Sequence, residues 1–218
     1  MLFVLPIRTS IRPWRTPYAN YALIAVNLII FFLTYGPHRH IIAGQLMVVP
    51  VHHWVERFML VPNDWHLQQF LSYAFLHGGI WHVVGNMFFL YVFGNNVNDK
   101  LGHLGYLGFY LAGAVFSGVG HTVFHSSSPI PTLGASGAVA AVIGAYLALF
   151  PQTLLTVLYW LLFFIGTMEI PALYFIGFKL IFWDNMYERR IPNVAYDAHL
   201  SGYAFGILAI LVLSLIHI

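Results

Sequence analysis

The chain of 218 residues contains no cysteine. It therefore has neither a disulfide framework nor a thiolate nucleophile, and it cannot build a four-sulfur metal site. Charged residues are also scarce: they make up 7% of the chain, against about 25% in a typical soluble domain. The formal net charge is only +2 with histidine neutral, and the basic residues are scattered along the chain. We therefore expect no nucleic-acid partner.

Apolar residues take the place of the missing charge. They make up 60% of the chain, and the mean hydropathy is +0.77. Several apolar runs approach the ~20 residues that a helix needs to cross the ~30 Å hydrocarbon core of a bilayer. No linker, internal repeat or low-complexity stretch divides the chain. The composition thus indicates a single domain embedded in the lipid bilayer.

Six membrane-spanning helices account for most of the apolar runs. We place them at residues 18–35, 80–93, 104–123, 135–150, 170–183 (slightly extended) and 198–216. The run at 154–165 is too short for a full span, so we interpret it as an interfacial or re-entrant piece, and a seven-span arrangement stays open. The predicted fold class is an all-α polytopic membrane helix bundle over residues 18–218, preceded by an N-terminal segment at 1–17.

Basic residues near the first span set the predicted orientation. Arg8, Arg12 and Arg15 precede what we interpret as an uncleaved signal-anchor, and they place the N-terminus in the cytoplasm by the positive-inside rule. Arg189 and Arg190 oppose this orientation, because they fall on the outer side of a six-span arrangement. With the N-terminus inside, the second, fourth and sixth spans all enter from the outer side. Their first turns should therefore lie at one level.

Polar side chains stand in these first turns. His82 and Asn86 are four residues apart and share one helical face. Inside a membrane such polar side chains cost free energy unless they face the interior of the bundle or a water-filled cavity. They therefore either form hydrogen bonds that join helices or belong to a functional site. Ser136 begins a stripe of small residues, which suits either close helix packing or a nucleophile. It does not match the nucleophile elbow of soluble hydrolases, because Ala138 breaks that pattern.

His199, in the first turn of the last span, bears on the role of Ser136. Gly202 and Gly206 lie on the same side of that helix and would let it approach the small-residue stripe of the fourth span. The approach would bring His199 to Ser136, and a neutral imidazole beside a serine hydroxyl can act as its general base. A helix N-terminus also favours a neutral imidazole and a developing oxyanion. We interpret Asp197 as an N-cap or first-turn acid, because it points to the other side of the helix.

The remaining histidines do not predict a metal site. His52 and His53 are adjacent and point apart, no His-Glu-x-x-His motif occurs, and Glu169 is distant in sequence from any histidine pair. We therefore predict no metal and no cofactor. Lys179, inside the fifth span, is expected to snorkel or to pair, and we assign it no role.

Three motifs, in this order and on these spans, resemble those of the rhomboid intramembrane serine proteases. The resemblance covers residues 75–206. The motifs are Phe75-Leu76-His77-Gly78-Gly79 followed by His82-x-x-x-Asn86-Met87, then Gly134-Ala135-Ser136-Gly137, and finally Ala198-His199-x-x-Gly202-x-x-x-Gly206. Each motif alone would be weakly specific, whereas the ordered set is strongly specific.

The resemblance implies a Ser-His dyad in a water-filled cavity that opens to the outer side. Ser136 would be the nucleophile and His199 the base, while His82, Asn86 and the backbone N–H of Ser136 would form the oxyanion hole. Supporting positions would be His77, Gly134, Gly137, Gly202 and Gly206. The long connection before the second span would lie in the outer leaflet, and the fifth span with the loop at 184–197 would gate access. Substrates of the family are transmembrane helices of other proteins.

Three positions depart from the family pattern. Ala140 stands where an aromatic ring often stacks on the catalytic base, so another residue must orient His199. Asn98 replaces a common acidic residue, and Gln68-Gln69 stands where some members have a Trp-Arg pair.

We predict an intramembrane serine endopeptidase of the bacterial inner membrane, with its N-terminus in the cytoplasm. One alternative is an inactive rhomboid-like protein that binds transmembrane helices. Another is a small transporter, which would place half-helices and charges at the membrane midplane rather than polar groups near one surface. The sequence carries no signal for the oligomeric state or for the identity of the substrate.

Overall fold

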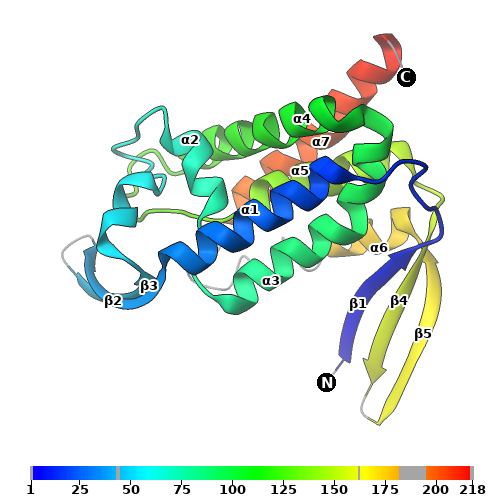
Figure 1. The fold of residues 1–218 in the computed structure, drawn as a ribbon, viewed down its shortest axis with the longest axis horizontal. Coiled ribbons are helices and arrows are strands. Elements are labelled where there is room, and N and C mark those ends of the chain that lie inside the picture. Colours follow the sequence, from blue (N-terminus) through cyan, green and yellow to red (C-terminus); the bar gives the residue numbers. More distant parts are fainter. Residues whose placement is uncertain (1, 43–44, 162, 182–194, 217–218) are drawn as a thin grey trace.

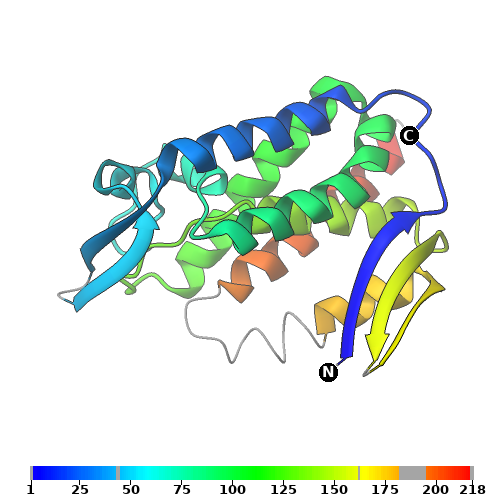
Figure 2. The same cartoon turned by 60° about the horizontal axis from the view of Figure 1, so that its bottom comes forward.

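A computed structural model describes residues 2–42, 45–161, 163–181 and 195–216, and helices dominate it (Figures 1 and 2). The α-helices are α1 (Tyr18–Thr34), α2 (Gln69–Ser72), α3 (Ile80–Phe89), α4 (Asn95–Phe124), α5 (Ser136–Leu149), α6 (Ala172–Phe178) and α7 (Tyr196–Ile216). Two 3-10 turns, η1 (His53–Phe58) and η2 (Tyr73–Phe75), precede α3. A π-helical turn, η3 (Leu90–Gly94), joins α3 to α4.

Two small antiparallel sheets correct the all-α prediction. Strands β1 (Leu2–Thr9), β4 (Leu154–Leu161) and β5 (Phe164–Pro171) form a sheet in the order β1-β4-β5, and β2 (Tyr35–Ile42) pairs with β3 (Gln45–Val51). Leu154–Leu161 is therefore a strand, and Phe164 and Ile165 begin the next one. The interpretation of this run as an interfacial or re-entrant piece stays a prediction. Thr156, Val157, Tyr159 and Trp160 are residue types that favour strands.

The predicted second and third spans form one helical run of 45 residues, Ile80–Phe124, which folds back on itself. The reversal is at Gly102, whose φ of 72° is a left-handed conformation that glycine adopts readily. Figure 1 shows α3 and the later part of α4 running in opposite directions. Helices thus cover the residues of both predicted spans, and they meet at Gly102.

The count of six spans is not confirmed. Among the described residues, two helical segments are long and apolar enough to cross a bilayer, Ile80–Phe124 and Tyr196–Leu215, and three shorter apolar helices occur at Tyr18–Thr34, Ser136–Leu149 and Ala172–Ile181. The fifth span is corrected at its start, because Ile170 still belongs to β5 and the helix begins at Ala172. Its end, Arg189 and Arg190, and most of the predicted gating loop lie outside the described residues.

A buried hydrogen-bond network around Asn20 fixes α1 against the junction of α3 and α4. The Asn20 side-chain amide donates to the Leu90 carbonyl (2.9 Å) and to Asn95 Oδ1 (2.8 Å), while its own Oδ1 accepts from the Tyr106 hydroxyl (2.6 Å). The backbone N–H of Asn20 donates to Asn98 Oδ1 (3.2 Å). Asn98 therefore accepts a hydrogen bond from one of the N–H groups in the first turn of α1, which have no partner within their own helix.

Helix α5 is the centre of the bundle, and α7 packs closely along it. Every residue from Gly137 to Tyr146 is buried. A Cβ added at Gly202 would collide with the Gly137 carbonyl, and one added at Gly206 would collide with the Ala141 carbonyl. The predicted close approach of the last span to the small-residue stripe is thus confirmed. Only glycine fits at these two positions, because the atoms in the way belong to the backbone.

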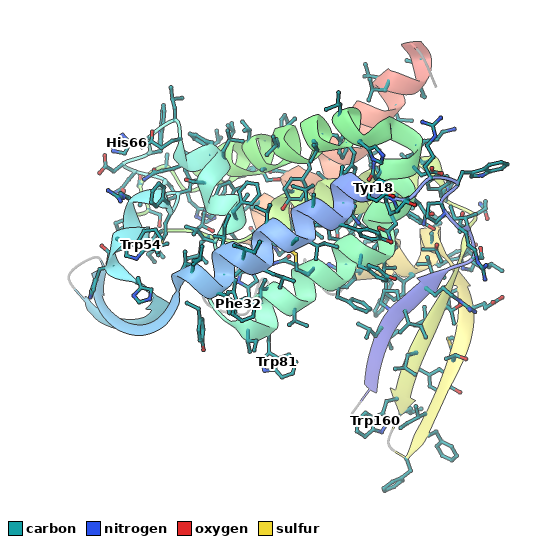
Figure 3. All side chains as sticks on the ribbon, viewed as in Figure 1. Tyr18, Phe32, Trp54, His66, Trp81 and Trp160 are labelled. Atoms are coloured by element: carbon teal, nitrogen blue, oxygen red, sulfur yellow. The ribbon has the colours of Figure 1, made fainter. Side chains whose placement is uncertain are left out.

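The outer surface of the bundle carries large apolar side chains (Figure 3). Phe32 on α1 is 74% exposed, and Trp81 on α3 is 83% exposed; both point away from the other helices. Isolated exposed apolar residues are normal on soluble proteins, but continuous apolar surfaces mark contact with other proteins or with a membrane. This surface therefore agrees with a bundle surrounded by lipid.

Candidate functional site

A cavity of about 360 Å³ opens between α3, α5 and α7. His82 and Asn86 line it from α3, Ser136 from the first position of α5, and His199 from the first turn of α7. Three separate helices thus bring these four residues to one cavity, and their catalytic roles stay a prediction. The cavity has a size typical of sites for small ligands or peptide segments.

The turn before Ser136 depends on Gly134. Its φ of 139° is unfavourable for residues with a side chain, and its N–H donates to the Tyr73 carbonyl at 2.9 Å. A Cβ at this position would lie 2.9 Å from His82 Nε2 and 3.6 Å from Ser136 Oγ. Gly134 therefore leaves open the space that the His82 ring and the Ser136 hydroxyl both face.

The hydrogen bonds of His82 and Asn86 suit a pair of N–H donors. His82 Nδ1 lies 3.4 Å from the backbone N–H of Gly78, which can only donate, so we assign the ring proton to Nε2 on the side of Gly134. The Asn86 amide donates one N–H to the His82 carbonyl at 3.1 Å. An amide carries two N–H groups, and the second has no hydrogen-bond partner among the described residues, so it is available to the cavity that Asn86 lines.

His77 lies behind the His82 ring. It is fully buried, and the two imidazoles meet edge to face with their centroids 5.2 Å apart. Burial, together with the neighbouring His82, lowers the pKa of His77 to about 3. His77 is therefore neutral at physiological pH and packs against His82, and its supporting role stays a prediction.

Lys179 and Tyr203 are among the cavity residues that were not predicted as part of the site. Lys179, directly after α6, lines the cavity and donates from Nζ to the Tyr203 hydroxyl at 3.1 Å. The expectation that Lys179 pairs is thus confirmed. Tyr203 lies four residues after His199 and hence on the same side of α7, so an aromatic side chain from α7 borders the cavity that Ala140 also lines.

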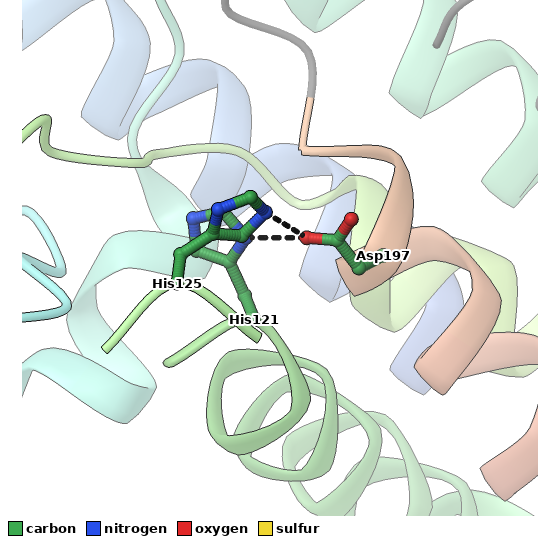
Figure 4. A network of polar contacts seen from close by, with 3 residues as sticks. All are labelled: His121, His125 and Asp197. Carbon is green, nitrogen blue, oxygen red and sulfur yellow. Dashed lines mark hydrogen bonds and ion pairs between the residues drawn. The ribbon is translucent and has the colours of Figure 1, made fainter. Parts of the chain in front are cut away.

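Asp197 lies in the first turn of α7, as predicted. Its carboxylate contacts two histidines at the end of α4, with Oδ2 2.7 Å from His125 Nε2 and 3.1 Å from His121 Nδ1 (Figure 4). Sequence reasoning did not identify either histidine. The sequence pattern that could have identified them is their spacing of four residues at the outer end of the third predicted span. This spacing puts both histidines on one helical face, beside the start of the last span.

Comparisons with known proteins give the family. The sequence profile described as Rhomboid domain matches residues 64–216. The chain belongs to the rhomboid family. This family of membrane proteins includes serine intramembrane proteases, and it acts on membrane-protein substrates within the bilayer.

Two relatives are mitochondrial rhomboids. Rhomboid protein 1, mitochondrial, of Saccharomyces cerevisiae is 27% identical over 196 residues, which cover 86% of this chain and 51% of the relative. RHOMBOID-like protein 12, mitochondrial, of Arabidopsis thaliana is 33% identical over 160 residues, which cover 66% of this chain and 45% of the relative. The chain thus spans about half the length of these rhomboids. Because both are mitochondrial, the predicted bacterial inner membrane is unsupported, and the membrane location alone stands.

Proposed function

We propose that this rhomboid is an intramembrane serine endopeptidase that cleaves transmembrane helices of other proteins near the outer face of the membrane. The main support is the single cavity lined by Ser136, His199, His82 and Asn86. These residues come from three helices that are far apart in the sequence. Hydrogen bonds that only hold the helices together would require no more than pairs of polar groups. A nucleophile, a base and two N–H donors around one cavity are instead the groups needed for acyl transfer.

In the proposed reaction, Ser136 Oγ attacks the carbonyl carbon of the scissile peptide bond while His199 takes the hydroxyl proton. The carbonyl oxygen becomes an oxyanion, which accepts hydrogen bonds from His82, Asn86 and the N–H of Ser136. Collapse of this intermediate breaks the C–N bond, and His199 returns the proton to the leaving amine. Water then hydrolyses the acyl-enzyme by the same base and frees Ser136.

Covalent labelling tests the proposed nucleophile directly. A serine-reactive fluorophosphonate should label the detergent-solubilised protein once per chain, and peptide mapping should place the label on Ser136. His199→Ala should greatly reduce labelling, because the hydroxyl then lacks its general base. Ser214→Ala is a matched control: this exposed serine lies at the far end of α7, so its loss should leave labelling unchanged. A folded protein that is never labelled would favour the inactive relative that binds transmembrane helices.

Removal of one oxyanion donor is expected to slow the reaction rather than stop it. Asn86→Ala should lower kcat for a transmembrane substrate on the order of 10²–10³-fold, with little change in KM, because the lost hydrogen bond forms mainly in the transition state.

Asn27→Ala is the matched control for Asn86. Asn27 Nδ2 donates to the Leu23 carbonyl at 2.9 Å, the same bond to the fourth preceding residue that Asn86 makes, but it lies on α1 and does not line the cavity. Its loss should reduce stability without lowering kcat per folded molecule. Equal losses of kcat in the two variants would contradict the role of Asn86 as a donor.

A further inference from the structure

A second group of polar side chains lies outside the proposed dyad, where the end of α4 meets the start of α7. It consists of His121, His125 and Asp197, which Figure 4 shows with both imidazoles directed at one carboxylate oxygen. His121 and Asp197 are buried, with 9% and 6% of their side chains exposed, whereas the His125 side chain is 43% exposed. The proposed reaction does not use any of the three.

The donor atoms have a spacing that fits a metal ion. In a tetrahedral zinc site with bonds of about 2.0–2.2 Å, neighbouring ligand atoms are roughly 3.3–3.5 Å apart. Here Asp197 Oδ2 is 3.1 Å from His121 Nδ1 and 2.7 Å from His125 Nε2, and all three atoms lie within 4.8 Å of one another. A small rotation of the half-exposed His125 would make room for the ion.

The residue types and their placement also suit a transition metal. Two imidazoles separated by one helical turn can bind one ion from the same side, and a carboxylate completes a mixed nitrogen and oxygen set typical of zinc. The carboxylate gives the cluster one negative charge when both imidazoles are neutral. The exposed face of His125 gives an ion access from solvent and leaves room for water as the fourth ligand.

We propose that His121, His125 and Asp197 bind one divalent transition-metal ion of the zinc class, with water as the fourth ligand. The ion would link α4 to α7 across the outer end of the bundle. Asp197 precedes the proposed base His199 by two residues, so the bound ion would hold the turn that carries the base. This site is separate from the proposed chemistry, in which no metal takes part.

Zinc titration of the full chain tests the site. Protein purified in detergent, stripped with a chelator and dialysed, is titrated with Zn²⁺ by calorimetry, and its melting temperature is measured with and without the ion. We expect one Zn²⁺ per chain, a higher Tm, and no response to Mg²⁺, which prefers all-oxygen sites. Co²⁺ in place of Zn²⁺ should give the visible absorption of a tetrahedral site.

His125→Ala is the decisive variant, because the exposed His125 can be removed with little risk to the fold. Mutation of a residue that hydrogen-bonds to a metal ligand typically lowers metal affinity about 10–100-fold. Loss of a direct ligand should therefore lower Zn²⁺ affinity at least about 100-fold and should abolish the rise in Tm. His66→Ala, at an exposed histidine that is not part of the cluster, should bind like the unmodified protein. The proposal is overturned if the unmodified protein does not bind Zn²⁺, or if the two variants bind it equally.

Discussion

Replacement of Ser136 by alanine is expected to reduce cleavage of a transmembrane substrate to the uncatalysed background while the fold stays intact. The substitution removes the oxygen that attacks the substrate in the proposed reaction, and the alanine methyl group cannot act as a nucleophile. The fold should survive because alanine suits the small-residue contacts of α5. The measurement is the cleavage rate in proteoliposomes, with thermal unfolding of the same preparation to show that the protein is folded.

Ser117→Ala separates this chemical role from close packing. Ser117 lies where α4 meets α5, with its Cβ 2.5 Å from the place that a Cβ on Gly137 would occupy, and its buried hydroxyl has no hydrogen-bond partner among the described residues. Its loss should leave cleavage nearly unchanged. The double variant Ser136→Ala/His199→Ala should be no slower than either single variant, because the two residues act as a unit. Substantial cleavage by Ser136→Ala would refute the assignment of the nucleophile.

The arrangement of the site could be predicted because it depends on the direction in which helices run. His82, Ser136 and His199 each stand near the start of an apolar run, and alternate runs start on the same side of a membrane. The close contact of α5 with α7 could be predicted from Gly202 and Gly206, since small residues are what close helix packing requires. Neither inference needed accurate helix boundaries.

The strands could not be predicted in the same way. An apolar stretch of eight residues such as Leu154–Leu161 has no period that separates a buried strand from a short helix, and its partners β1 and β5 are set by tertiary pairing. The contacts of Asp197 were missed for a related reason. The sequence showed which side of its own helix Asp197 occupies, but it did not show that α4 would bring His121 and His125 to that side.

The glycine at position 206 is expected to be the most sensitive packing position in the bundle. In Gly206→Ala, the new Cβ would collide with the Ala141 carbonyl and would lie 2.9 Å from the Ala145 backbone nitrogen. Backbone atoms inside a helix cannot move aside as a flexible side chain can, so α7 must shift away from α5. We expect a loss of about 1–3 kcal/mol in the free energy of unfolding, measured by denaturant titration in mixed micelles.

Cleavage should fall further than this loss of stability explains. His199 lies two helical turns before Gly206 on α7, so a shift of the helix by about 1 Å would misplace the base, and such a displacement can cost about 10²-fold in rate. Gly108→Ala is the matched control, because a Cβ at this glycine of α4 would meet no atom within 4 Å. It should retain both stability and cleavage. If Gly206→Ala cleaved substrate as fast as Gly108→Ala, the proposed dyad would not depend on the close contact of α5 and α7.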